Sequence, residues 1–228
     1  MIADQWPLFG LTLHTPRLEL RVPGPERLAE LAALAAGGVH DPAVQPFVAE
    51  WTDAPPERVA TSVLQWQWRS WAGWRPENWS LSFVAIVDGR VVGTQAMEAT
   101  SFATLREVGT GSWLGRAEQG RGIGTEMRAA VLELAFAGLG ARFATSEAFE
   151  DNHASYAVSR KLGYAADGIS RHVIRGAPSV SRRLRLDRAA WAEARTVPVR
   201  IEGLAPCLPM FGLQQQSAPA SKAGVDLL

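Results

Sequence analysis

Cysteine is almost absent from this chain of 228 residues, because Cys207 is the only one. A single cysteine excludes an intrachain disulfide framework and any cysteine-rich zinc module, and it suits a reducing compartment. A surplus of charge is also missing, since 23 Lys and Arg balance 23 Asp and Glu. Proteins bind nucleic acid largely through Lys and Arg side chains that contact its phosphate backbone. The balanced charge of this chain therefore argues against a nucleic-acid partner.

The sequence also lacks the marks of a secreted or membrane protein. Its first ten residues, MIADQWPLFG, carry neither the positive charge nor the apolar core of a signal peptide. No uncharged apolar stretch approaches the roughly 20 residues of a membrane-spanning helix. The histidines lack the paired spacing of a metal site; they are His14, His40, His153 and His172. We therefore expect a soluble cytoplasmic protein with no membrane partner and no metal.

What the sequence does contain is a succession of strand and helix patterns. Alternating apolar residues from Leu11 to Val22 predict one strand with an edge proline. Two β-rich runs between Leu81 and Ala99 flank the turn signal Asp88-Gly89 and predict an antiparallel pair. Further strands are predicted at 107–114, 142–149, 164–174, 180–186 and 197–203, and helices at 26–36, 56–74, after Gly124, at 152–162 and, as a short piece, around Trp191.

The most informative segment is the glycine-rich run from Gln119 to Thr125 (QGRGIGT), which follows a predicted strand and opens a helix. Glycines let the backbone approach a ligand, and a helix N-terminus adds partial positive charge, so a pyrophosphate can be held there without a metal. No G-K-[ST] follows, as a Walker loop requires, and the last glycine of G-x-G-x-x-G would fall on Thr125. ATP and NAD therefore fit poorly, while a plain tight connection stays open.

Three motifs together resemble the GCN5-related N-acetyltransferases (GNAT), and within them the RimJ/RimL-type subgroup. The Q-x-x-G-x-G pattern at Gln119–Gly124 resembles the acyl-CoA pyrophosphate loop. The segment from Asp151 to Tyr164 is similar to the D-N-x-x-S-x-x-V-x-x-K-L-G-[FY] helix, and Thr15–Arg21 to the opening T-x-R-L-x-L-R strand. The runs GSWLG, GTEMRAAVL and VRIEG…MFG are most similar to actinobacterial RimL-like members described as succinyltransferases.

The resemblance implies an α/β fold of the GNAT type: a mixed, mainly antiparallel twisted sheet that is split at its centre, with about four helices. The pantetheine arm of acyl-CoA would lie in the split, along the free backbone edge of the strand from Ser112 to Leu114, where an N–H near Trp113 would stabilise the thioester oxyanion. The residues expected to bind the acyl-CoA are Trp113, Leu114, Gln119, Gly120, Arg121, Gly122, Gly124, Thr125, Asn152 and Ser155.

The resemblance also implies catalytic roles. Ser155 takes the position that in RimL-like enzymes stabilises or protonates the departing thiolate, whereas the tyrosine that other branches use would fall on Ser159. A free alkyl amine with a pKa near 10 is mostly protonated at neutral pH, so a proton acceptor is needed. Glu107 is the first candidate, Glu147 the second and His172 the third. A surface role for the two glutamates and a structural role for the histidine stay open, as does plain helix capping for Asn152.

The expected function is N-acyl transfer from acetyl-CoA or succinyl-CoA to a primary amine, by direct attack in a ternary complex. The acceptor is a protein N-terminus or a small molecule; the alternative function is a non-catalytic CoA-binding regulator. A succinyl carboxylate would need a nearby cation or hydroxyl, and Arg106, Arg171 and Arg175 are the candidate cations if the fold brings one of them to the sulfur end. The expected division is an acyltransferase domain at 1–190, a C-terminal extension at 191–213 and a disordered tail at 214–228. The extension either folds back or contacts another subunit of a homo-oligomer.

Overall fold

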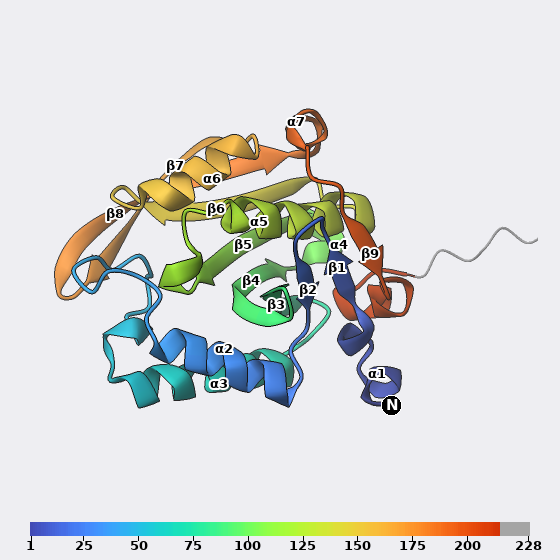
Figure 1. Ribbon diagram of the computed structural model, residues 1–228. Coiled ribbons are helices and arrows are strands. Elements are labelled where there is room, and N and C mark those ends of the chain that lie inside the picture. The colour runs from blue at the N-terminus through green and yellow to red at the C-terminus, as the bar shows by residue number, and fades with distance from the viewer. Residues whose placement is uncertain (215–228) are drawn as a thin grey trace, which may run out of the picture.

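The computed structural model describes residues 1–214, and these form one nine-stranded twisted sheet with helices on both faces (Figure 1). The strand order is β7-β8-β6-β5-β4-β3-β2-β1-β9. Every neighbouring pair is antiparallel except β5 and β6, which are parallel and joined through a helix. The strands are β1 (Thr12–His14), β2 (Glu19–Arg21), β3 (Asn78–Val87), β4 (Arg90–Thr100), β5 (Glu107–Leu114), β6 (Phe143–Phe149), β7 (Ala165–Ile174), β8 (Ala177–Asp187) and β9 (Arg200–Glu202). The predicted α/β architecture with a mixed, mainly antiparallel sheet is confirmed. The predicted tail lies outside the described residues, apart from Gln214.

The prediction of about four helices is wrong, because residues 1–214 hold seven α-helices besides short 3-10 and π segments. Two of the additional helices have only four residues each, too few for a helical period to show in the sequence. The helices are α1 (Ile2–Gln5), α2 (Pro25–Ala36), α3 (Pro56–Ala72), α4 (Phe102–Leu105), α5 (Ile123–Glu133), α6 (His153–Lys161) and α7 (Arg188–Ala194).

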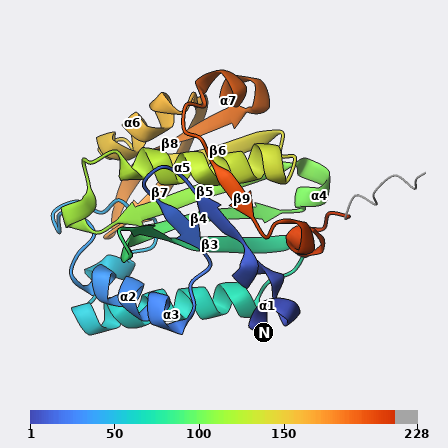
Figure 2. The same ribbon diagram turned by 45° about the vertical axis from the view of Figure 1, so that its right-hand side comes forward.

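Two pairs of helices cover opposite faces of the sheet. Figures 1 and 2 agree that α2 and α3 lie on one face and that α5 and α6 lie on the other. The apolar side of α5 is almost wholly buried against β4 and β5, which makes this helix the centre of the core. No helix within residues 1–214 is long and apolar enough to cross a lipid bilayer.

The segment from Leu11 to Val22 forms a hairpin of β1 and β2 rather than the single predicted strand. The chain reverses at Pro16, which has no N–H to donate to a sheet. The Thr15 N–H donates to the Leu18 carbonyl at 2.9 Å, and the Leu18 N–H donates to Thr15 Oγ1 at 3.0 Å. Apolar residues before and after this turn face the same core, so the alternation in the sequence does not reveal it.

The C-terminal extension folds back onto its own chain. Strand β9 pairs with β1 in the register Leu13 to Ile201, and so completes one edge of the sheet. Beyond β9, Cys207 and Phe211 are fully buried, and the Trp74 indole N–H donates to a main-chain carbonyl of the extension at 2.9 Å. Of the two arrangements expected for the extension, the structure shows the one in which it folds back onto its own chain.

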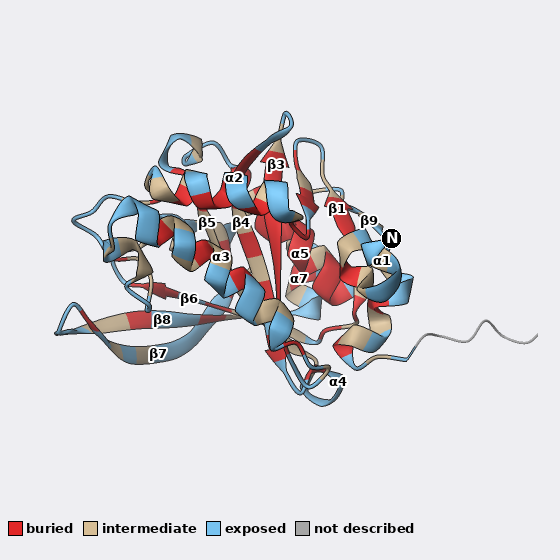
Figure 3. Ribbon diagram, turned by 90° about the horizontal axis from the view of Figure 1, so that it is seen from below, coloured by how far each residue is buried: buried red, intermediate tan, exposed pale blue. Residues whose placement is uncertain are grey.

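The β7–β8 hairpin lies at the other edge of the sheet and projects from the body of the molecule (Figure 3). Its turn is Arg175-Gly176, and both residues have positive φ, at 49° and 76°. Two consecutive left-handed residues are typical of the tight hairpin turn whose twist matches that of the strands. Exposed residues predominate along β7, whereas Leu184 and Leu186 of β8 are buried in the core, so we call only the projecting turn end of this hairpin the arm.

Candidate active site

The sheet is split between its two parallel strands. Strands β5 and β6 pair at only three positions, the last of which joins Gly109 to Thr145. At the fork the Thr110 hydroxyl donates to the Thr145 carbonyl at 3.1 Å, so a side chain makes the last direct hydrogen bond between the two strands. From Thr110 to Leu114, β5 keeps β4 on one side and has no partner strand on the other among the described residues.

A buried side-chain amide lies at the β4–β5 ladder beside the split. The side-chain amide of Gln95 on β4 donates to the carbonyls of Ala96 and Gly111, at 3.1 and 3.0 Å. Gln95 is fully buried, and its amide thus takes up carbonyl groups that a regular ladder would pair with backbone N–H groups. The neighbouring Gly93 allows the strands to approach, since a Cβ there would lie 2.3 Å from the Trp113 carbonyl oxygen.

The free edge of β5 presents backbone N–H groups to the split. The Gly115 N–H donates to the Val92 carbonyl at 3.0 Å. Because Val92 belongs to β4, the N–H of Gly115 points toward β4 and away from the split. Because donors alternate along a strand, Trp113 also directs its N–H toward β4, while its neighbours Ser112 and Leu114 direct theirs to the split. The free donors therefore flank Trp113.

The predicted glycine loop forms a turn at the N-terminus of α5. Gly120 and Gly122 have φ of +74° and +80°, a conformation that glycine adopts without strain, and Gly122 is the N-cap. The first backbone donor after the turn that finds a carbonyl is Glu126, which bonds to Gly122 at 3.2 Å. Within residues 1–214, no acceptor is found for the N–H groups from Gly120 to Thr125. This cluster of unpaired donors at a helix N-terminus can bind a phosphate group.

The turn is held in place from several sides. Gln119 donates its side-chain amide to the carbonyls of Val39 and Leu114, at 2.7 and 3.0 Å, so this predicted ligand residue is occupied within the protein. Arg121 forms an ion pair with Glu118. Arg17, from the predicted T-x-R-L-x-L-R motif, donates to the Arg121 carbonyl at 3.1 Å.

Helix α6 begins beside this turn. The Asn152 side chain accepts a hydrogen bond from the Ser155 N–H at 3.1 Å, which is an N-cap. Ser155 itself is half-buried. Helices α5 and α6 are in contact, and a Cβ on Gly124 would lie 3.9 Å from the Val158 side chain. The structure therefore brings the predicted residues of the glycine loop and of the α6 N-terminus to the same end of the split. The neighbouring Thr125 is half-buried in the first turn of α5.

The predicted proton acceptors lie at different places along the split. Glu107 lies where β5 and β6 are still paired, 3.6 Å from Arg185. Glu147 lies two residues beyond the last paired residue of β6, within the split. Its carboxylate accepts from His172 Nε2 at 2.9 Å and from the Ser181 hydroxyl. The structure thus links the second and third candidates to each other.

Glu147 stays ionised at neutral pH. Partial burial acts to raise its pKa, but hydrogen bonds from Ser181, His172 and Ser170 outweigh burial, so the pKa of Glu147 lies below its ordinary value. A carboxylate of this kind can accept a proton directly or through water once an ammonium group comes near.

The two faces of the split carry different side chains. Ser112 and Ser146 face α5, where both contact Arg128. Because side chains alternate along a strand, Trp113 and Glu147 face the other side, toward α2 and α3. There the Trp113 ring lies 5.8 Å from the Trp51 ring, in the loop between these helices.

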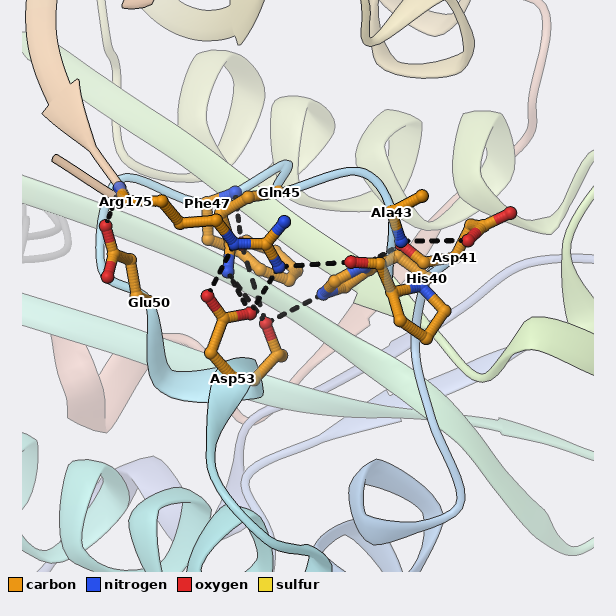
Figure 4. A network of polar contacts seen from close by, with 10 residues as sticks. His40, Asp41, Ala43, Gln45, Phe47, Glu50, Asp53 and Arg175 are labelled. Atoms are coloured by element: carbon orange, nitrogen blue, oxygen red, sulfur yellow. Dashed lines mark hydrogen bonds and ion pairs between the residues drawn. The ribbon is translucent and has the colours of Figure 1, made fainter. Parts of the chain in front are cut away.

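That loop is joined to the tip of the β7–β8 arm by a clasp, which we define as Arg175 with Glu50 and Asp53 (Figure 4). The Arg175 guanidinium binds the Asp53 carboxylate through two nitrogens, at 2.6 and 2.7 Å. The Arg175 backbone N–H also donates to Glu50, and a further guanidinium bond reaches the Pro42 carbonyl at 3.1 Å. Hydrogen bonding to Arg175 lowers the pKa of Asp53, with smaller contributions from His40 and Gln45. On the face of the sheet that carries Trp113, the clasp therefore connects the β7–β8 turn to the loop between α2 and α3.

Several site residues were not found from the sequence. Arg128 and Glu126 lie on α5 among apolar residues and are both buried, but no short motif marks them. Of the cations considered for a succinyl carboxylate, Arg175 is engaged in the clasp, and Arg106 donates to the Leu139 carbonyl at 3.2 Å. Arg171 is exposed on β7. Among the described residues, no group of three His, Cys, Asp or Glu side chains is placed to hold a metal ion.

A sequence profile of the family described as acetyltransferase (GNAT) domain matches residues 17–165. The match includes β2, the split strands, the glycine turn and α6, and it extends over more than half of the chain.

Solved structures share the fold at low sequence identity. RimJ of Mycobacterium smegmatis, in complex with CoA-disulfide, is 21% identical with a TM-score of 0.66, over 80% of this chain and 90% of its own. RimL, a ribosomal L7/L12 alpha-N-protein acetyltransferase in complex with coenzyme A, is 17% identical with a TM-score of 0.61, over 77% and 97%. A microcin C7 self-immunity acetyltransferase, in complex with acetyl-CoA and AMP, is 15% identical with a TM-score of 0.58, over 75% and 93%.

Proposed function

The chain belongs to the GNAT acetyltransferase family, and from this premise we propose that it transfers an acyl group from acyl-CoA directly to a primary amine. The observation that carries the proposal is the split of β5 from β6, with a turn of unpaired N–H groups at its mouth. The turn would hold the pyrophosphate of the acyl-CoA substrate, and the free edge of β5 would pair with its pantetheine arm. Gly120, Gly122, Gly124, Thr125 and Arg121 supply or border these donors, while Gln119 positions them.

The chemistry follows from the two faces of the split. The acceptor amine would approach from the face that carries Trp113 and Glu147, and it would attack the thioester carbon. The N–H groups that flank Trp113 would stabilise the oxyanion, because they are already directed at the split and need no reorganisation. Asn152 would contact the pantetheine arm, and Ser155, whose N–H donates to the Asn152 side chain, would donate a hydrogen bond to the departing thiolate.

We propose Glu147 as the proton acceptor in preference to Glu107. Glu147 lies within the split and is hydrogen-bonded to His172, whereas Glu107 lies in the paired part of the ladder beside Arg185. Glu147→Gln should lower kcat and move the acid limb of the pH–rate profile, and Glu107→Gln is the matched control. A larger loss of kcat in Glu107→Gln would reverse this assignment.

The donor is acetyl-CoA or succinyl-CoA, and the acceptor is a protein N-terminus or a small-molecule amine. Among the similar structures, one is described as a ribosomal L7/L12 alpha-N-protein acetyltransferase, which supports a protein N-terminus as one acceptor class. A non-catalytic CoA-binding regulator is the alternative function. It would bind acyl-CoA with full affinity and turn over no amine.

The first experiment is calorimetric binding of acetyl-CoA, succinyl-CoA, CoA, ATP and NADH to the full chain at one salt concentration. Micromolar affinity for the CoA compounds alone supports the proposal, and a preference between the two esters identifies the donor. Binding of ATP or NADH in place of CoA would refute it. Turnover on a panel of amines then separates the enzyme from the regulator, and Ser155→Ala should lower kcat more than it weakens CoA binding.

A further inference from the structure

Arg128 is a buried cation on the α5 side of the split. It lies on α5, and only 4% of its surface is exposed. Its Nη1 donates to the Ser159 hydroxyl at 2.8 Å and to the Ser146 hydroxyl at 3.4 Å, and its Nη2 donates to the Ser112 hydroxyl at 3.4 Å. The three serines belong to α6, β6 and β5, so the guanidinium joins both edges of the split to the helix beside them.

No carboxylate accompanies this charge in residues 1–214. The hydrogen bonds of Arg128 go only to hydroxyl groups, and its Nε is buried without any partner. The Tyr164 phenol interacts electrostatically with Arg128, but burial raises the pKa of Tyr164, so this phenol stays neutral. Burial lowers the pKa of Arg128, but a guanidinium remains protonated in proteins. A buried charge without a counter-ion is costly, and such groups are concentrated at functional sites.

Arg128 lies beside the part of the split where the thioester end of acyl-CoA is expected. Ser112 lies on β5 beyond the last residue paired with β6, and Ser146 is the first residue of β6 beyond that pair. Ser159 occupies the place that the family resemblance gives to a tyrosine acting on the thiolate. Here Ser159 is fully buried, and its hydroxyl contacts the guanidinium. The cation therefore lies where a phenol would otherwise be expected.

We propose that Arg128 is a further catalytic residue, whose guanidinium stabilises the negative charge on the sulfur of the departing CoA thiolate. This inference rests on the proposed acyl transfer. In that step the amine nitrogen forms a bond to the acyl carbon, and the carbon–sulfur bond breaks with its electron pair remaining on sulfur. The amine proton passes to the proton acceptor, and Arg128 donates hydrogen bonds without losing a proton. Its buried charge is fixed before the reaction, so it favours the charge-separated state without reorganisation.

The rival role for the same cation is to bind a permanent carboxylate in the acyl group of the donor. The two roles differ in what they require of the substrate. Thiolate stabilisation acts on every acyl-CoA, because the same sulfur departs each time. Carboxylate binding acts only on a donor such as succinyl-CoA and leaves acetyl-CoA turnover unaffected.

The test is a titration of the CoA thiol bound to the full chain, followed by the ultraviolet absorbance of the thiolate. On the wild-type protein, the bound thiol should ionise at lower pH than free CoA. Arg128→Met should abolish this shift and lower kcat with acetyl-CoA by about 10²–10³-fold, the loss typical of removing one preorganised donor. Arg128→Lys should keep part of both effects, because it keeps the charge. Arg27→Met, an equivalent change at an exposed ion pair on α2, should change neither.

Each other outcome is decisive. A bound thiol on the wild-type protein that titrates like free CoA overturns the role of Arg128 but not the proposed function, because CoA is still bound. Failure of the wild-type protein to bind CoA overturns the proposed function itself. Loss of succinyl-CoA turnover alone in Arg128→Met overturns the proposal in favour of the carboxylate role. If circular dichroism shows that Arg128→Met does not fold, Arg128→Gln, which keeps polar hydrogen-bonding groups and removes the charge, carries the test: an unchanged thiol titration there refutes the proposal.

Discussion

Glu126 joins the glycine turn to the β1–β2 hairpin, and its replacement tests how that turn is held. Its side chain is 9% exposed. One carboxylate oxygen accepts from Thr15 Oγ1 at 2.6 Å and from the Arg17 N–H at 3.1 Å; the other accepts from Arg17 Nε at 2.7 Å and pairs with Nη2. In Glu126→Gln one oxygen becomes an NH2 group, which faces donors and cannot accept from them. We therefore expect two of the four contacts to be lost.

The magnitude follows from burial on the two sides of the pair. A hydrogen bond to a charged group contributes about 1.5–3 kcal/mol to stability. The Arg17 side chain is 52% exposed, so solvent screening reduces the contribution of its contacts with Glu126. We expect Glu126→Gln to lower the free energy of unfolding by about 2 kcal/mol. For a domain of this size, that corresponds to a fall in Tm of about 4–8 °C.

The assay is urea unfolding at pH 7, repeated with Arg17→Met and with the double variant. If the two side chains stabilise the turn together, their effects should be non-additive by more than about 0.5 kcal/mol. Glu30→Gln, at an exposed ion pair on α2, is the control and should change stability by less than about 0.5 kcal/mol. Additive effects of Glu126→Gln and Arg17→Met, or a Glu126→Gln midpoint equal to that of the control, would refute the reasoning.

Three further predictions concern other parts of the molecule. Hydrogen bonding to Arg175 lowers the folded-state pKa of Asp53 below 3.8, so the stability that the clasp provides is present above that pH and is lost as the pH falls through the folded value. Urea midpoints of wild type and Arg175→Ala should therefore differ at pH 7 and converge in acid, and a constant difference would contradict this. Burial raises the pKa of Cys207 to about 11, so a thiol reagent should label the native protein slowly and the urea-unfolded protein fast; equal rates would argue against burial. Gly122→Ala, at φ +80°, should lower stability by about 1–2 kcal/mol, whereas Gly124→Ala meets only ordinary contacts and should melt like wild type. Calorimetry with CoA then tests the turn, since a lower affinity in Gly124→Ala reports a contact with the ligand, and unchanged affinity would remove Gly124 from the site.

Local chemistry made much of the fold predictable from the sequence. The boundaries predicted for the strand from Glu107 to Leu114 agree with β5, which Gly115 and the glycine-rich run follow directly. The Asp88-Gly89 signal forms the turn between β3 and β4, with φ of 48° and 77°. The glycine loop follows β5 and opens α5 as expected. In each case the residues that determine the structure lie within a few positions of one another.

The contacts that complete the site could not be predicted, since they join distant parts of the chain. Arg175 and Asp53 are 122 positions apart and meet only because the β7–β8 arm reaches the loop between α2 and α3. The three serines around Arg128 carry no signal of their own, because serine is common in every kind of element. A buried arginine within an apolar helix pattern was the one available sign, and it becomes informative only when its neighbours are known.

The two sides of the split differ in charge in the sense that acyl transfer requires. On the face toward α2 and α3, Glu147 lies within the split, and the exposed Glu98 side chain lies beside Gly109, at the last paired position. On the face toward α5, the only charged side chain bonded to both edges of the split among the described residues is Arg128. During the reaction a proton leaves the amine, and negative charge moves to sulfur. An acidic face favours the first event and a buried cation the second, so removing each charge separately, by Glu147→Gln or by Arg128→Met, should impair different steps. Glu147→Gln should affect proton removal and depend on pH, whereas Arg128→Met should affect thiolate departure at every pH.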